Sequence, residues 1–293
     1  MKKILLLALL VSNVSFAQIA KYKAANFKLT SDVTLYEDNE YAYDTIANKY
    51  QLKSKRSISL DKGLVIKIVT EQNYSMYSKI FTDFVYEKGL LKSILKNWDG
   101  TETIEKFTYK DGKVIEKTSE GDFFTKNTYQ YDTKGNLTNE TVYEDDVLLK
   151  KITYSNYTSP NSYSKITVNF NDNEEESRYE EKFENGYLTE EKAIYPSHVS
   201  SASYTNDKLG NIITYTNDGK TDTNNFEYDS KGNVLKSKII QRGYYGMPDT
   251  NYFTFAKVIY SDGKTSGTTN LDTNFVKKFE PNSASYQTIE VLE

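Results

Sequence analysis

His198 is the one residue in this chain that could serve as an imidazole general base. It lies in the segment Tyr195-Pro-Ser-His-Val-Ser-Ser, close to Ser197, Ser200 and Ser201. Partners of a Ser-His-Asp triad are assembled in space, so closeness along the chain is no evidence for a triad. We expect His198 to be an exposed loop residue.

The chain has no cysteine, which excludes thiol nucleophiles, thiolate metal sites, disulfides and lipidated cysteines. Its single histidine excludes a multi-histidine metal centre.

Two carboxylates would suffice for glycoside hydrolysis, and the chain has 41 acidic residues. Many of these acids precede glycine in short polar segments, where a carboxylate hydrogen-bonds the backbone of a turn. The examples are Asp111, Asp132, Asp218, Asp229 and Asp262. The turn interpretation is therefore favoured, and a carboxylate-dependent glycosidase is the least favoured function. No catalytic residue is predicted.

Oxygen ligands for calcium are concentrated in residues 171–176 (Asn-Asp-Asn-Glu-Glu-Glu) and 37–40 (Glu-Asp-Asn-Glu). Neither segment has the spaced Asp-x-Asp-x-Asp-Gly plan of a dedicated calcium loop. Solvated charged turns with weak calcium binding at most are expected. The sequence predicts no metal site and no cofactor.

The aromatic residues offer a binding chemistry instead. There are 26 tyrosines, and rings on a flat sheet face could stack against sugars. Trp98 precedes the Asp99-Gly100 turn, and Arg242, Tyr244 and Tyr245 lie in an irregular segment that ends at Pro248. Irregular loops on regular scaffolds often carry binding residues. These four residues are the candidate ligand-binding set; the simpler alternative is that the tyrosines pack across strands.

An internal repeat predicts the elements that would position these residues. From residue 86 an aromatic residue precedes glycine by three or four positions, at intervals of about 22 residues in the clearest cases. The instances begin at Tyr86, Tyr109, Tyr131, Phe183, Tyr215, Tyr228 and Tyr260, with Asn206 keeping the register at one point. Asp111-Gly112 and Asn185-Gly186 suit two-residue hairpin turns, and the Asp-x-Lys-Gly forms suit a type I turn closed by glycine.

The flanking residues alternate as strands do: Ile166, Val168 and Phe170 share one face, and Lys165, Thr167 and Asn169 share the other. The fold class is therefore all-β, an antiparallel meander of consecutive hairpins that forms an open curled sheet or a partly closed barrel. Residues 18–85 are expected to be less regular strands, with candidates at 28–36, 50–60 and 64–70. Residues 86–263 form the hairpin meander of the same domain, and residues 264–293 a polar tail or final strands.

Two repeat units, 131–138 and 228–235, resemble the YD repeat of Rhs- and teneurin-type proteins, in which Tyr-Asp precedes Gly-Asn and a polar strand. The stretch Phe183-Glu-Asn-Gly186-Tyr-Leu is similar to MORN-like variant repeats. The resemblance implies a long β-meander. It also points to small exported bacterial proteins with YD-like hairpins, to which carbohydrate binding is often attached.

Residues 1–17 have the plan of a secretory signal: Lys2 and Lys3, an apolar run from Ile4 to Val11, and Ser15-Phe16-Ala17 before the cleavage site. The run is shorter than the ~20 residues of a membrane-spanning helix. Removal of residues 1–17 takes away two lysines and no acid, so the net charge changes from −4 to −6. An exported chain, periplasmic or extracellular, without a later transmembrane segment is predicted. Its acidity argues against a nucleic-acid surface.

An outer-membrane barrel would need continuously apolar outward positions, whereas both faces carry Lys, Glu, Thr or Asn, as in residues 103–110.

Taken together, these features lead us to expect a non-catalytic, exported binding or structural repeat protein that recognises an envelope glycan through exposed aromatic residues. The alternative is a protein-interaction role, as an immunity or accessory protein of an exported partner, through an acidic face or a strand edge.

Overall fold

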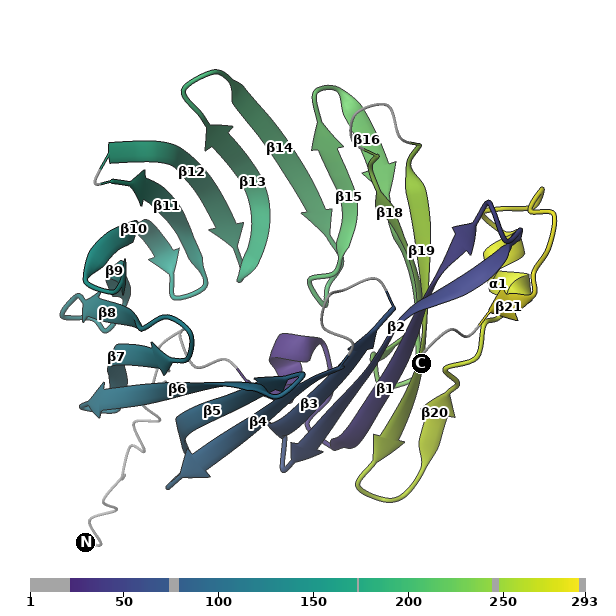
Figure 1. Cartoon of the computed structure of the whole chain (residues 1–293), viewed down its shortest axis with the longest axis horizontal. Helices are drawn as coiled ribbons and strands as arrows, with labels where there is room; N and C mark the ends of the chain where they lie inside the picture. Colours follow the sequence, from purple (N-terminus) through teal and green to yellow (C-terminus); the bar gives the residue numbers. More distant parts are fainter. Residues whose placement is uncertain (1–21, 74–78, 173, 244–247, 290–293) are drawn as a thin grey trace, which may run out of the picture.

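The computed structural model describes residues 22–73, 79–172, 174–243 and 248–289. It confirms the all-β prediction: the strands form one sheet that follows chain order and curls into a nearly closed barrel (Figure 1). The predicted signal segment and Tyr244 and Tyr245 lie outside the described residues. The first half contains β1 (Val33–Asp44), β2 (Lys49–Asp61), β3 (Leu64–Gln72), β4 (Lys79–Glu87), β5 (Leu90–Trp98), β6 (Thr101–Lys110), β7 (Lys113–Glu120), β8 (Thr125–Tyr131), β9 (Leu137–Glu144) and β10 (Val147–Ser159). The second half contains β11 (Ser162–Asn171), β12 (Glu174–Glu184), β13 (Tyr187–Ile194), β14 (Val199–Asn206), β15 (Ile212–Asn217), β16 (Lys220–Thr223), β17 (Asn225–Tyr228), β18 (Val234–Gln241) and β19 (Thr250–Tyr260).

The first and last long strands join the ring. β1 pairs with β2 along one edge and with β19 along the other, so that Glu37 lies between Ser57 and Lys257. Every other neighbour in the ring is the next strand along the chain, except at one seam. There β16 pairs with β15, and β17, only one residue further on, pairs with β18. Side chains bridge the seam: Asn224 Oδ1 accepts from the Ile240 backbone N–H at 3.2 Å, and Lys238 Nζ donates to the Thr223 carbonyl at 3.2 Å.

An antiparallel meander places alternate turns at opposite ends of the sheet. We call one end the plugged rim; its turns lie at 62–63, 88–89, 111–112, 132–136, 160–161, 185–186, 207–211, 229–233 and 261–264. We call the other end the open rim; its described turns lie at 45–48, 99–100, 121–124, 145–146, 195–198 and 218–219.

Residues 22–32, which include η1 (Ala24–Phe27), cross the plugged rim inside the ring (Figure 1). On one side, Val65 N–H donates to the Tyr22 carbonyl at 2.8 Å. On the other side, Lys28 Nζ donates to the Gly210 carbonyl at 3.1 Å, and Thr30 N–H donates to Asn233 Oδ1 at 2.8 Å. This N-terminal segment therefore ties β3 to the turns that follow β14 and β17.

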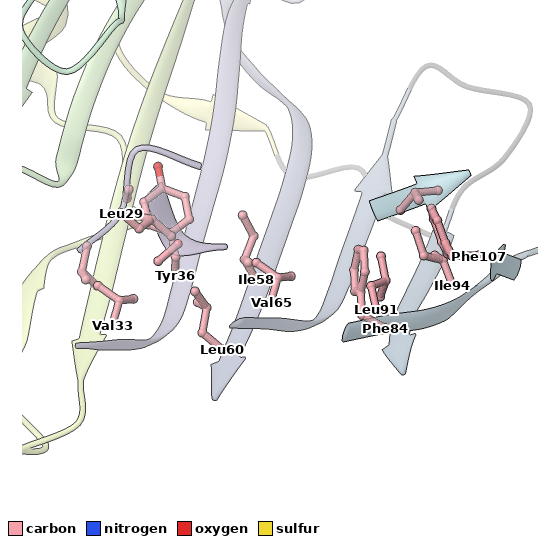
Figure 2. Packing of buried hydrophobic residues seen from close by; sticks show 14 of the residues in the cluster. Leu29, Val33, Tyr36, Ile58, Leu60, Val65, Phe84, Leu91, Ile94 and Phe107 are labelled. Atoms are coloured by element: carbon pink, nitrogen blue, oxygen red, sulfur yellow. The ribbon is translucent and has the colours of Figure 1, made fainter. Parts of the chain in front are cut away.

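The aliphatic core lies on the inner face near the plugged rim. Its side chains come from successive strands and pack against the N-terminal segment, with Leu29 beside Tyr36 (Figure 2). Its members include Leu29, Val33, Tyr36, Ile58, Leu60, Val65, Phe84, Leu91, Ile94, Phe107, Val114, Leu137 and Val258. Burial of this apolar surface is the main stabilising contribution of the barrel.

The aromatic residue of the repeat has a defined structural role. Four inward-facing tyrosines donate their hydroxyls to a backbone carbonyl of the preceding repeat, at 2.7 to 3.0 Å. The pairs are Tyr86 to Val65, Tyr109 to Leu91, Tyr131 to Val114 and Tyr157 to Leu137. Asn206 takes the same position by donating to the Leu188 carbonyl at 2.9 Å. We call this series the hydroxyl ladder.

The Asp-x-x-Gly-Asn turns are identical in their hydrogen bonds. In residues 132–136 and 229–233 the aspartate Oδ1 accepts from the backbone N–H groups two and four positions later, and the asparagine side chain donates to Oδ2. Residues 207–211 form a third copy, in the repeat unit in which Asn206 takes the place of the tyrosine.

The C-terminal tail is more ordered than a loose end. It contains β20 (Thr265–Gly267), the short helix α1 (Thr273–Lys277) and β21 (Thr288–Ile289). Asp272 caps the helix by accepting from the Asn274 and Phe275 N–H groups. Phe275 and Val276 then join a second, mainly aromatic cluster with residues of β1, β2 and β19. Where the chain is described, it has no helix of the length and apolarity that would cross a bilayer.

Candidate ligand-binding face inside the barrel

The inner face changes character between the two rims. Strand register places Asp38 beside Arg56 and Glu105 beside Ile94, so both acids share the face of the aliphatic core but lie nearer the open rim. The same register brings Thr167 and Asn169 of β11 to this face and turns Ile166 outward. The inner face is therefore apolar toward the plugged rim and polar toward the open rim.

Several inward charges occur as ion pairs. Lys96 Nζ lies 2.5 Å from Glu105 Oε1, and Lys165 Nζ lies 2.6 Å from Glu181 Oε2. Arg56 forms a similar pair with Asp38, whose carboxylate is almost fully buried. Burial raises the pKa of Asp38, while the Arg56 guanidinium opposes that change. These pairs neutralise the charges they contain, so the face they line suits a polar ligand without a large net charge.

Aromatic rings line the part of the inner face that belongs to β10–β15. They form close ring pairs with centroids 4.9 Å apart for Tyr163 and Phe183 and 5.3 Å apart for Tyr204 and Tyr215. All four rings stay partly exposed. Tyr163, Phe183 and Tyr204 lie close to the plugged-rim turns at 160–161, 185–186 and 207–211, and Tyr215 lies midway along β15. Burial and the nearby Glu191 carboxylate raise the pKa of Tyr204 to about 12, so its hydroxyl is a neutral donor at physiological pH.

Polar groups lie among these rings. Asn217 Nδ2 donates to the Tyr215 hydroxyl at 3.0 Å and to Ser200 Oγ at 3.1 Å. Glu191 faces Glu181 directly across β12 and β13, and burial followed by the Glu181 charge raises the pKa of Glu191. Aromatic faces interspersed with hydroxyl, amide and carboxylate groups are the mixture that small-ligand sites use. We call Tyr163, Tyr204 and Tyr215, with the polar groups between them, the tyrosine face.

The two described residues of the predicted binding set both lie toward the open rim. Trp98 ends β5, where its register partners are Ile80 and Thr101. Arg242 follows β18 and is engaged within the protein: it pairs with Asp222 and donates to the Lys220 carbonyl at 2.7 Å. Strands β4, β3, β2, β1 and β19 separate β5 from β18 in the sheet, so Trp98 and Arg242 lie at different places on the ring. The part of the site that sequence reasoning missed is the tyrosine face; alternation of tyrosines along β11 to β15 could have indicated it.

His198 lies at the open rim as an exposed residue. Its ring stacks on Tyr195 with centroids 4.6 Å apart, and Nδ1 lies 3.1 Å from Ser197 Oγ. Of the segments weighed for calcium, Asp38 is directed to Arg56, and Glu175 pairs with Arg178 at 3.0 Å. Among the described residues no group of three or more His, Asp or Glu side chains could hold a metal ion.

A second polar region lies mainly on the outward side of β11–β15. It is a groove of ≈ 830 Å³ whose lining includes Lys182, Glu190 and Ser203. Lys182 Nζ lies 3.1 Å from Glu190 Oε1, so its charges are paired across strands. The lining contains no aromatic residue, which makes this groove a poorer site for a ligand with a ring.

The comparisons with known proteins identify no family for this chain. No protein-family model matches the sequence, and no curated protein matches it. Among solved structures, the chain is similar to a porin-like protein from Bacteroides uniformis, at 15% identity and a TM-score of 0.45, over 78% of this chain and 97% of that one. The resemblance to YD-repeat and MORN-like proteins stays a prediction.

Proposed function

We propose that the protein is an exported, non-catalytic binding protein whose tyrosine face takes a neutral carbohydrate through the open rim. The observation that carries this proposal is the set of partly exposed rings on the inner face of β11–β15. A sugar presents apolar C–H faces that pack on aromatic rings and hydroxyl edges that need hydrogen bonds. Tyr204, Tyr215 and Asn217 offer both kinds of contact on neighbouring strands.

The two rims differ in a way that favours entry from one side. The N-terminal segment and the hydroxyl ladder fill the plugged rim with apolar side chains. Toward the open rim the inner face carries polar and charged groups such as Asp38, Arg56 and Asn169. A ligand that enters from the open rim reaches Tyr215 first and then the rings of Tyr204 and Tyr163, which lie nearer the plugged rim.

The test uses the mature chain, residues 18–293, and a panel of soluble neutral oligosaccharides, with binding measured by calorimetry. Tyr204→Ala and Tyr215→Ala should each weaken binding by about tenfold or more, as expected for central aromatic contacts. Tyr143→Ala is the matched control, because register places Tyr143 on the outward face opposite Lys126. Circular dichroism should report an intact sheet in all three variants. An absence of binding across the panel, or an equal loss in Tyr143→Ala, would exclude the proposal.

A further inference from the structure

An exposed aromatic turn projects from the open rim between β7 and β8. Phe123 is 62% exposed and Phe124 40% exposed, and Val147 in the neighbouring β9–β10 connection is 49% exposed. Large apolar side chains exposed in adjacent turns are a feature of interaction surfaces. We define the aromatic turn as residues 121–124 together with residues 145–147.

The backbone holds the two connections together. Asp145 N–H donates to the Phe124 carbonyl at 2.9 Å, and Phe124 N–H donates to Asp145 Oδ1 at 3.3 Å. These bonds extend the β8–β9 ladder beyond Thr125 and Glu144. The phenylalanines are thus presented on a braced platform, which lowers the entropy lost when a partner binds.

Acidic side chains surround the two phenyl rings, so a partner that binds here should be positively charged. Asp122, Asp145 and Asp146 are exposed, and none of them forms an ion pair with another described residue. Two acids of the neighbouring strand β7 are already neutralised: Glu116 by Lys126 and Glu120 by Lys106, each at 2.8 Å. A second copy of this chain would bring acid against acid at the same turn, so self-association is disfavoured there.

We propose that the aromatic turn is a docking surface for a different, basic protein whose Lys or Arg side chains flank an apolar recess. The phenyl rings fill the recess as buried anchors, and the three carboxylates pair with the flanking cations. This surface is separate from the tyrosine face, so the docking proposal stands or fails independently of carbohydrate binding.

The first experiment selects a displayed random-peptide library on the mature chain, with counter-selection on Phe123→Ser. The expected peptides combine Lys or Arg with apolar residues. Their affinity should fall about tenfold or more in Phe123→Ser, and several-fold in high salt or in Asp122→Asn/Asp146→Asn. Ile46→Ser is the matched apolar control because Ile46, at the same rim, is 98% exposed, and Asp218→Asn is the matched acidic control. No enriched peptide, uncharged peptides, or equal binding to Phe123→Ser would overturn the proposal.

The second experiment identifies the native partner and uses the absence of cysteine in the chain. A photo-crosslinker attached to Phe123→Cys, the sole thiol, should join one basic protein in envelope fractions of the producing cells. The same label on Ile46→Cys should not join it, and adding the selected peptide should reduce the adduct. Identical adducts at both positions, or none at Phe123→Cys, would contradict the docking surface.

Discussion

Asn233 is the residue at which the repeat turns meet the N-terminal segment. Its side chain is fully buried, with Nδ2 donating to Asp229 Oδ2 and to the Tyr260 hydroxyl, both at 3.0 Å. Its Oδ1 accepts from the Thr30 N–H. Asn136 is in the same position of an identical turn but makes only the local bond to Asp132. One repeat position therefore has a structural role in one unit and a purely local role in another.

Asn233→Ala should lower the free energy of unfolding by about 2 to 3 kcal/mol, since it leaves the Thr30 N–H without its partner and removes the bonds of Nδ2 to Asp229 Oδ2 and to the Tyr260 hydroxyl. Asn136→Ala is the matched control and should cost about 1 kcal/mol, the value of one partly exposed hydrogen bond. Urea denaturation of both variants measures the difference. Equal losses would mean that the contact with the N-terminal segment adds nothing to stability.

At the scale of the element, the sequence predicts what is encoded locally. The turns at 111–112 and 185–186 follow from Asp-Gly and Asn-Gly, because both pairs tolerate the positive φ found there. The N-terminal segment could not be predicted in this way. Lys28 reaches Gly210 across 182 residues of sequence and Thr30 reaches Asn233 across 203, and no local pattern specifies such contacts.

The candidate site also has one part that the sequence predicts and one part that it does not. Trp98 and Arg242 could be placed near turns from the sequence, and strand counting puts both turns at the open rim. The role of Arg242 could not be predicted from the sequence, because its partner Asp222 is 20 residues away and faces it only when the seam forms. The tyrosine face depends on which side of each strand turns inward, and on β11 that side is the polar one.

The hydroxyl ladder makes a prediction about alkaline pH. Burial raises the pKa of Tyr86 and of Tyr157 to about 12, whereas tyrosine in an unfolded chain ionises near 10. A raised folded pKa means that the ladder's contribution is complete below about pH 10 and is lost as the pH rises through about 12. Tyrosinate absorbance and circular dichroism, followed together, should reveal one group of tyrosines that ionises only as the sheet unfolds. Ionisation of all tyrosines near pH 10 with the sheet intact would contradict this.

At the scale of the whole molecule, the barrel depends on two long-range junctions. The β1–β19 pairing is a continuous backbone ladder from Leu35 to Ala42. The seam between β16 and β18 instead relies on side chains, chiefly Arg242, Lys238 and Asn224. The outward face meanwhile carries cross-strand ion pairs, such as Lys106 with Glu120 and Lys182 with Glu190, which suit contact with water. The seam is thus the part of the ring where one side-chain substitution should lower the free energy of unfolding most.

Arg242→Ala tests whether the seam or a ligand explains this arginine. Asp222 is 6% exposed, and removal of its cation leaves a buried, unpaired carboxylate, which typically costs about 3 to 5 kcal/mol. The double variant Arg242→Ala/Asp222→Ala removes both charges and should recover part of that loss, as measured by urea denaturation. If Arg242→Ala instead keeps the unfolding free energy of the parent and loses only carbohydrate binding, Arg242 is a ligand contact and the seam is held by its other side chains.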